Sequence, residues 1–249
     1  MATFVLVHGA WHGGWCWRKV AAGLRRAGAE VHTPTLTGLG ERSHLTACLA
    51  PAAINLDLHI KDVVQVLEYE GLEQVILVGH AYGGMVITGV ASAAGGCPER
   101  LGRLVYVNGV VPRNGEAMVD HLERVRGPQF VAWVREHIDQ GPGFLPPPTT
   151  PQEVEGRWGI ADPGDQAWVL ARVAPQPVAA FAQPLKVGNL QAKSLPRSFI
   201  LSSESGFEAV AEQAREAGWG LYLMDTGHDP MITQPQELVQ ILLDIAEKG

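Results

Sequence analysis

The 249-residue sequence has no long apolar run and no basic N-terminal segment. A membrane-spanning helix needs about 20 consecutive, mostly apolar residues, and no stretch of the chain meets that requirement. The chain begins Met1-Ala2-Thr3-Phe4 and passes straight into a short apolar run, unlike a signal peptide. The sequence therefore predicts no membrane partner and no cleaved leader.

Cysteine and positive charge are also scarce. The three cysteines (Cys16, Cys48 and Cys97) are scattered, without Cys-x-x-Cys pairs or the spacing of metal ligands. This usage is typical of a reducing compartment, so we expect a cytoplasmic protein and predict no metal site. The net charge is −7, with 26 acidic against 19 basic residues. Such a balance disfavours nucleic acid as a partner and favours a small-molecule ligand.

Short apolar runs alternate with helical patterns over the first 111 residues. Runs at 4–7, 30–36, 75–78 and 104–107 predict strands, while 15–26, 56–69 and 85–94 predict helices. Asn55 is a suitable N-cap for the second of these helices. An alternating order of this kind predicts an α/β fold with a mostly parallel central sheet and helices on both faces.

Residues 112–195 have a different texture. Amphipathic patterns predict helices at 118–125, 130–138 and 165–173, the proline-rich segment 141–151 separates them, and no buried-strand run occurs. The alternation then resumes with a strand at 198–202, a helix at 207–217, a strand at 221–224 and a helix at 236–247. We predict a core formed by 1–111 and 196–249, with 112–195 inserted as a helical cap over the active site.

The strand at 75–78 ends in Gly79-His80-Ala81-Tyr82-Gly83-Gly84 and leads directly into a helix. Glycines two residues before and two residues after a central residue are typical of a nucleophile elbow, where that residue has a strained backbone. An elbow of this kind presents a hydroxyl above the sheet. The central residue here is Ala81, which has no hydroxyl.

An elbow enzyme of the serine type also needs a base, an acid that orients the base, and two amides that bind an oxyanion. His228 follows the last predicted strand and is the expected base. The acid should follow the preceding strand, where Glu204 is our choice and Glu208 and Asp225 are alternatives.

The expected oxyanion hole consists of the backbone N–H groups of Ala10 and Tyr82. His8 is expected to support the first loop, and His12 and His80 to hydrogen-bond around the site. Aromatic side chains could line an apolar pocket, but no single one is assigned to substrate binding.

These motifs resemble the branch of α/β-hydrolases that contains plant methyl esterases, hydroxynitrile lyases and bacterial small-molecule esterases. The resemblance covers the first strand with its His8-Gly9-Ala10 loop, the elbow, and the Gly227-His228-Asp229-Pro230-Met231 segment. It implies an α/β-hydrolase fold, a Ser-His-acid triad, no cofactor, and hydrolysis of small esters.

Several positions depart from that family. Ala81 stands where the family has serine, and Ser205 aligns near its usual aspartate, one residue after Glu204. The lyase branch has a threonine and a lysine where this sequence has Gly9 and Asp229. The pattern therefore favours an esterase over a hydroxynitrile lyase.

Ala81 has two interpretations. In the first, alanine replaces the serine of a hydrolase that forms an acyl-enzyme, and the chain binds substrate without turning it over. In the second, alanine is native, and the protein is a pseudoenzyme or a small-molecule binding protein on the same fold. The tryptophan-rich entrance and acidic surface favour a small, neutral, aromatic ester or carbamate as the ligand.

Overall fold

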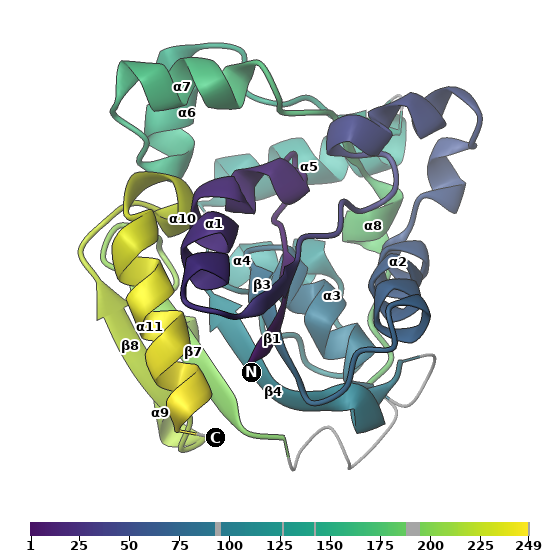
Figure 1. The fold of residues 1–249 in the computed structure, drawn as a ribbon. Helices are drawn as coiled ribbons and strands as arrows, with labels where there is room; N and C mark the ends of the chain where they lie inside the picture. Colours follow the sequence, from purple (N-terminus) through teal and green to yellow (C-terminus); the bar gives the residue numbers. More distant parts are fainter. Residues whose placement is uncertain (93–95, 126, 142, 188–194, 249) are drawn as a thin grey trace.

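A six-stranded sheet forms the centre of the computed structural model, which describes residues 1–92, 96–125, 127–141, 143–187 and 195–248 (Figure 1). The strand order is β2-β1-β3-β4-β7-β8, and every neighbouring pair is parallel. The predicted α/β fold with a parallel sheet is confirmed. The strands are β1 (Thr3–Val7), β2 (Glu30–His32), β3 (Val75–His80), β4 (Leu101–Val107), β7 (Arg197–Ser202) and β8 (Gly220–Met224).

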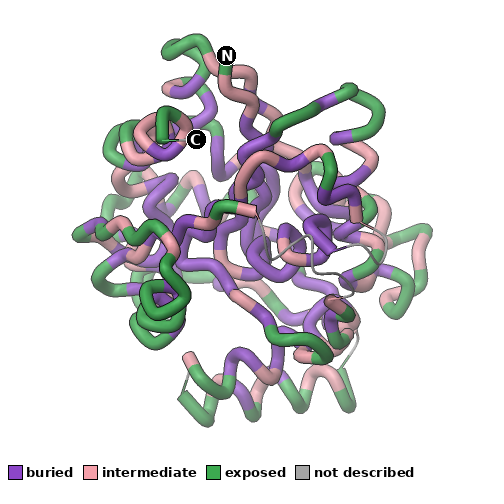
Figure 2. The backbone as a smooth tube through the Cα atoms, turned by 90° about the horizontal axis from the view of Figure 1, so that it is seen from below, coloured by how far each residue is buried: buried purple, intermediate pink, exposed green. Residues whose placement is uncertain are grey.

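Helices cover both faces of this sheet. The strand order reverses direction after β2, and parallel crossovers are right-handed, so the helix before β2 lies on one face of the sheet and the helices after it lie on the other. The first face holds α1 (Arg18–Arg26). The second face holds α2 (Leu56–Tyr69), α3 (Gly83–Val90) and α9 (Glu208–Glu216). The last helix, α11 (Pro235–Glu247), packs against α1. Figure 2 shows buried residues through the middle of the molecule and exposed residues around its outside.

The helix with the longest apolar pattern at helical spacing, α2, was predicted most closely. Helix α2 has the predicted bounds, and the Asn55 side chain caps it by accepting from the Leu58 N–H at 3.0 Å. The strand expected at 30–36 ends earlier, at His32. Its continuation leaves the sheet because the Leu36 N–H donates to the His8 ring at 3.0 Å instead of to a strand. The helix expected at 15–26 begins as the 3-10 helix η1 (Gly14–Trp17) before α1.

Between β4 and β7 the chain forms mainly helices. Here α4 has the predicted bounds, but α6 was not expected, because the prolines before it were interpreted as a connection. Pro151 occupies the first turn of α6, and the Thr150–Glu153 capping box closes its N-terminus. The helices are α4 (Met118–Val125), α5 (Pro128–Gln140), α6 (Pro151–Trp158), α7 (Pro163–Leu170) and α8 (Ala179–Ala182).

The described part of this region has no long buried strand, as its sequence indicated, but it does contain two strands of two residues each. A short antiparallel pair, β5 (Phe144–Leu145) with β6 (Gln176–Pro177), joins its two halves. The division of the chain into core and cap stays a prediction.

The remaining helices of the described chain are short. They are the 3-10 helices η2 (Gly40–Ala47), η3 (Pro51–Ala53) and η4 (Pro98–Arg100), and the α-helix α10 (Pro230–Thr233). None of the helices that can be described is long and apolar enough to cross a membrane.

Candidate active site

The predicted elbow lies between β3 and α3, with Ala81 at φ 47°. The turn is held on both sides: the Ala81 N–H donates to the Val107 carbonyl at 3.2 Å, and the Ala81 carbonyl accepts from Gly84 N–H at 3.0 Å. A Cβ at Gly83 would lie 2.7 Å from a carbonyl oxygen of β1, and one at Gly79 would lie 2.6 Å from the Gly83 oxygen. Glycine is required at both positions because a side chain would collide with backbone.

The Ala10 and Tyr82 amides lie beside this turn. Within the described chain, neither N–H donates a hydrogen bond to another residue. Both residues are buried, at 7% and 0% exposure, and both line the same cavity as Ala81. A buried amide normally has a partner, so two free donors here are suited to a ligand oxygen.

The cavity beside the elbow has a volume of about 360 Å³. It brings together Ala81, Ala10, Tyr82 and His228, which the sequence placed in three separate segments. Its other walls are mainly apolar and come largely from the region between β4 and β7; they include Met118, Leu122, Phe130, Trp158, Phe181 and Phe207. Its size and apolar lining are typical of a small-molecule site.

The loop that contains Ala10 is tied to the β5–β6 pair. Trp11, at φ 63°, donates from its backbone N–H to the Gln176 side chain and from its indole to the Leu145 carbonyl, each at 3.2 Å. These bonds cross more than 130 positions of sequence. The loop after β1 is therefore held by the β5–β6 pair as well as by β1.

Tyr82 is fixed by His59, which the sequence analysis missed. The His59 Nε2–H donates to the Thr37 carbonyl at 2.9 Å, so its Nδ1 accepts from the Tyr82 hydroxyl at 2.9 Å. Burial lowers the pKa of His59 and raises that of Tyr82, which keeps both groups neutral. A histidine three residues after Leu56, on the apolar face of α2, was the available signal.

His228 is buried, and its ring stacks on Phe207 with the centroids 5.4 Å apart. Its carbonyl oxygen accepts from His80 Nε2 at 3.0 Å and from the Asn108 side chain at 2.9 Å. Asn108, at φ 43°, also exchanges two hydrogen bonds with Ser202. Sequence reasoning missed Asn108, which links β4, β7 and the His228 loop.

The expected acids lie at the surface. Glu204, Glu208 and Asp225 are all exposed, and no hydrogen bond or ion pair to His228 is found for them among the described residues. Asp225 accepts from Ser203 Oγ at 2.8 Å, and Ser205 is buried with its Oγ donating to the Ser202 carbonyl. The geometry gives Glu204 no support, and an orienting acid remains a hypothesis.

A buried carboxylate lies on the other side of the site. Asp229 is 0% exposed and approaches His12 Nε2 at 3.0 Å and His80 Nε2 at 3.3 Å. Burial opposes its charge, but the imidazoles of His12, His80 and His228 together outweigh burial and lower the pKa of Asp229. His12 donates from Nδ1 to the Ala10 carbonyl at 2.7 Å, so His12 lies between Asp229 and the loop that follows β1.

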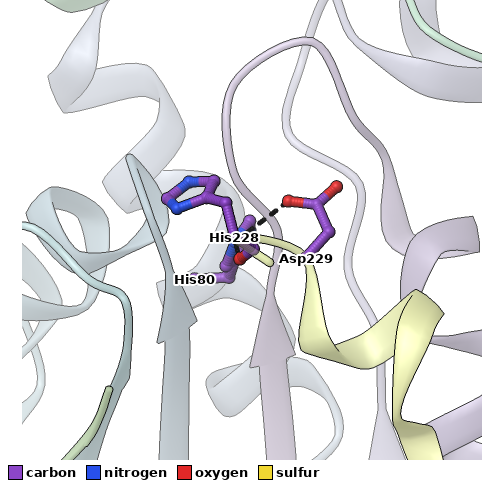
Figure 3. Close-up of side chains that lie close together, drawn as sticks. All are labelled: His80, His228 and Asp229. Atoms are coloured by element: carbon purple, nitrogen blue, oxygen red, sulfur yellow. Dashed lines mark hydrogen bonds and ion pairs between the residues drawn. The ribbon is translucent and has the colours of Figure 1, made fainter. Parts of the chain in front are cut away.

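His80, His228 and Asp229 each offer a potential metal ligand within 4.8 Å of the others. In Figure 3, however, the His228 ring and the Asp229 carboxylate lie on opposite sides of His80. The His80 Nε2 faces the His228 carbonyl and Asp229, so it is occupied as a donor. We assign no metal to this group, because the His80 Nε2 already donates to the His228 carbonyl.

The comparisons with known proteins agree with the fold and the motifs. The model of the alpha/beta hydrolase family matches residues 4–241. A carbendazim hydrolyzing esterase from Nocardioides sp. (strain SG-4G) is 39% identical, covering 97% of this chain and 98% of the relative. Methylesterase 18 from Arabidopsis thaliana is 29% identical, covering 98% and 96%.

Among solved structures, a variant of tomato methylketone synthase I complexed with beta-ketoheptanoate has a TM-score of 0.76. It is 24% identical, with 99% of this chain and 98% of that chain covered, which shows the shared fold. The predicted similarity to methyl esterases is confirmed by the curated relatives. The chain belongs to the alpha/beta hydrolase family.

Proposed function

We propose that the cavity binds the carbonyl group of a small carboxylic ester or carbamate, on an esterase scaffold whose nucleophile position holds Ala81. The observation that carries this proposal is the pair of free amide donors, Ala10 and Tyr82, beside the elbow. The esterase relatives that span the whole chain support it.

With serine at position 81, the reaction would follow the usual acyl transfer. The serine oxygen attacks the carbonyl carbon as His228 takes its proton, and the two amides stabilise the oxyanion. His228 then protonates the departing alcohol, and water cleaves the acyl-enzyme. With Ala81 the first bond cannot form, and loss of a triad nucleophile lowers kcat by about 10⁶. The chain should therefore bind esters without hydrolysing them.

A second gap limits what serine alone can restore. Ser205 aligns near the family aspartate, and the three expected carboxylates are all exposed. In a well-studied triad, removal of the acid's charge lowers kcat by about 10⁴. We therefore expect Ala81→Ser to restore slow turnover, and Ala81→Ser combined with Ser205→Asp to restore more.

The test measures hydrolysis of p-nitrophenyl acetate and of an aryl carbamate by the chain, by Ala81→Ser and by the double variant. A burst of nitrophenol equal to the enzyme concentration would identify an acyl-enzyme. Ala81→Gly is the matched control, since it changes the same position without supplying a hydroxyl. Folded serine variants that show neither a burst nor turnover would contradict the esterase assignment and favour the binding-protein alternative.

A hydroxynitrile lyase remains the weaker alternative, because Asp229 stands where that branch has a lysine. Cleavage of a cyanohydrin by the unmodified chain would favour it.

A reaction that needs no nucleophile is a second candidate, favoured by Ala81 itself. A 3-oxo acid bound through its ketone oxygen loses CO₂ as the carbon–carbon bond breaks, and its electron pair moves onto that oxygen. The Ala10 and Tyr82 amides would stabilise the resulting enolate, and His228 would protonate its carbon. The tomato methylketone synthase of the same fold was solved with beta-ketoheptanoate, a 3-oxo acid. Formation of acetophenone from benzoylacetate, lost in His228→Ala, would support this reaction.

A further inference from the structure

A buried carboxylate joins two segments that border the cavity. Asp229 is completely buried, and its carboxylate lies 3.0 Å from His12 Nε2 and 3.3 Å from His80 Nε2. His12 belongs to the loop after β1, His80 is the last residue of β3, and both line the cavity. One carboxylate therefore contacts side chains from both segments that lead to the free amides, Ala10 and Tyr82.

His12 connects this carboxylate to the backbone of the loop after β1. Its Nδ1–H donates to the Ala10 carbonyl at 2.7 Å, while its Nε2 faces Asp229. Carbonyl and carboxylate oxygens only accept, so the ring is placed to carry an N–H at both positions, as a cation beside its counter-ion.

The peptide unit between Ala10 and Trp11 is held at both of its polar groups. Its carbonyl accepts from His12, and its N–H, which belongs to Trp11, donates to the Gln176 side chain at 3.2 Å. Because a peptide unit is planar, fixing this unit leaves only the two dihedrals of Ala10 to set the direction of the Ala10 N–H. The contact between His12 and the Ala10 carbonyl therefore bears on where that free donor points.

Aromatic rings enclose the ion pair. The His12 ring stacks on Trp15 with the centroids 5.3 Å apart, and it meets Trp158 edge-on at 4.6 Å. The Asp229 N–H donates to the Trp158 carbonyl at 3.3 Å, at the end of α6. Removing one partner of a buried ion pair leaves the other charge uncompensated, so this pair resists movement of the loop that carries His12.

We propose that Asp229 is a positioning residue, which acts through His12 to aim the Ala10 N–H at the carbonyl oxygen of the ligand. The inference rests on the proposed function, which places that oxygen against the Ala10 and Tyr82 amides. Asp229 does not itself line the cavity, so it acts through another side chain. Because it directly follows His228, it also ties the loop of the expected base to the loop of the amide.

The test observes the hydrogen bonds of the ligand's carbonyl group. Methyl benzoate with an isotope label at its carbonyl is bound to saturation by the unmodified chain, where Ala81 should prevent turnover. Infrared difference spectroscopy then measures the stretching frequency of the bound carbonyl, which hydrogen bonds from the two amides lower. A structural defect elsewhere would weaken binding without changing this frequency at saturation.

Two variants interrupt the path from the carboxylate to Ala10. Asp229→Asn removes the charge that balances a protonated His12, and His12→Phe keeps a ring against Trp15 and Trp158 while removing both nitrogens. We expect each variant to raise the carbonyl frequency and to weaken ester binding by about threefold to tenfold, as for the loss of one hydrogen bond. Combining them should add nothing further, because both act on the same path.

Asp165→Asn is the matched control. Asp165 is also paired with a cation, Lys19 at 2.7 Å, but it does not line the cavity or contact His12. This variant should change neither the carbonyl frequency nor the affinity. Urea unfolding establishes that each variant is folded. If Asp229→Asn does not fold, His12→Phe decides alone, and an unchanged frequency in it refutes the inference.

The remaining outcomes separate the two proposals. If the ester does not bind to the unmodified chain, or binds with the carbonyl frequency that it has in hexane, the proposed carbonyl site fails and the role of Asp229 fails with it. If the frequency is lowered and stays the same in folded Asp229→Asn, the carbonyl site stands and the positioning role is refuted. A frequency change on Asp229→Asn that is equally large when His12→Phe is already present would show that Asp229 does not act through His12, which would also overturn the inference.

Discussion

Buried histidines whose pKa is lowered predict that this protein loses stability steeply in acid. His8 is fully buried, donates from Nδ1 to the Gly9 carbonyl at 2.8 Å and accepts at Nε2 from the Leu36 N–H at 3.0 Å. Burial lowers the pKa of His8 from 6.5 to about 3. A second proton on His8 would break the bond to Leu36. Burial likewise lowers the pKa of His80 from 6.5 to about 4.

The sign of the effect follows from these directions. Between the lowered pKa and 6.5 the unfolded chain binds a proton that the folded chain does not, so the free energy of unfolding falls as pH falls. One pKa unit corresponds to about 1.4 kcal/mol, which gives about 5 kcal/mol for His8 and about 3 kcal/mol for His80. The loss begins below pH 6.5. Its total is comparable with the stability of a whole domain.

Urea unfolding at a series of pH values between 4.5 and 7.5 measures this dependence. We expect a plateau above pH 6.5 and a fall in the free energy of unfolding below it, to which each histidine with a lowered pKa contributes about 1 kcal/mol per pH unit near pH 5. His59 and His121 contribute there as well as His8 and His80, because burial lowers the pKa of all four. His8→Gln removes one titrating group while keeping a donor and an acceptor, so its slope should be smaller by about 1 kcal/mol per pH unit. His44→Gln is the control, because His44 is exposed. A flat profile between pH 5 and 7, or an unchanged slope in His8→Gln, would refute the reasoning.

Three further predictions concern the elbow and its supports. Gly83→Ala should lower the free energy of unfolding by about 1–3 kcal/mol, because its Cβ would lie 2.7 Å from a backbone atom. Urea unfolding measures this change. Gly127→Ala is the control and should not destabilise the fold, because there is open space around Gly127. Tyr82→Phe should lower the free energy of unfolding by about 1–3 kcal/mol, because it leaves His59 Nδ1 without its hydrogen bond. An unchanged midpoint of thermal unfolding would argue against the bond between Tyr82 and His59. Asp229→Asn should lower the free energy of unfolding by about 3–5 kcal/mol, and it should weaken ester binding because His12 loses its carboxylate partner. Asp225→Asn, at an exposed position, should have neither effect.

Local signals predicted the elbow and helix α2 well. Gly79 is needed by the backbone of the same turn, because its Cβ would meet the Gly83 oxygen, and Gly83 is needed by the neighbouring strand β1. An apolar stripe at helical spacing defines α2 whatever it packs against. The alternation of strands and helices likewise predicted the parallel sheet, because such crossovers have one favoured hand. Proline was the misleading signal: before α6 it occupies the first turn instead of breaking a helix.

Which acidic residue lies against the histidines of the site could not be read from the sequence. Glu204 and Asp229 are both acidic residues in loops after strands, yet one is exposed and the other is completely buried between two imidazoles. Which of them meets a ring depends on how segments more than 100 positions apart pack together. The same is true of Asn108, which bonds to the His228 carbonyl.

The sequence by itself determined that a strand ends in a strained turn at an alanine, because the glycine pattern that marks such a turn lies within a few positions of Ala81. Only the tertiary structure decided which groups surround that alanine. The free amides of Ala10 and Tyr82 belong to two separate loops, and Arg157, which also lines the cavity, lies on α6. Burial and long-range contact set the charge and shape of the site, and neither is a local property of the chain.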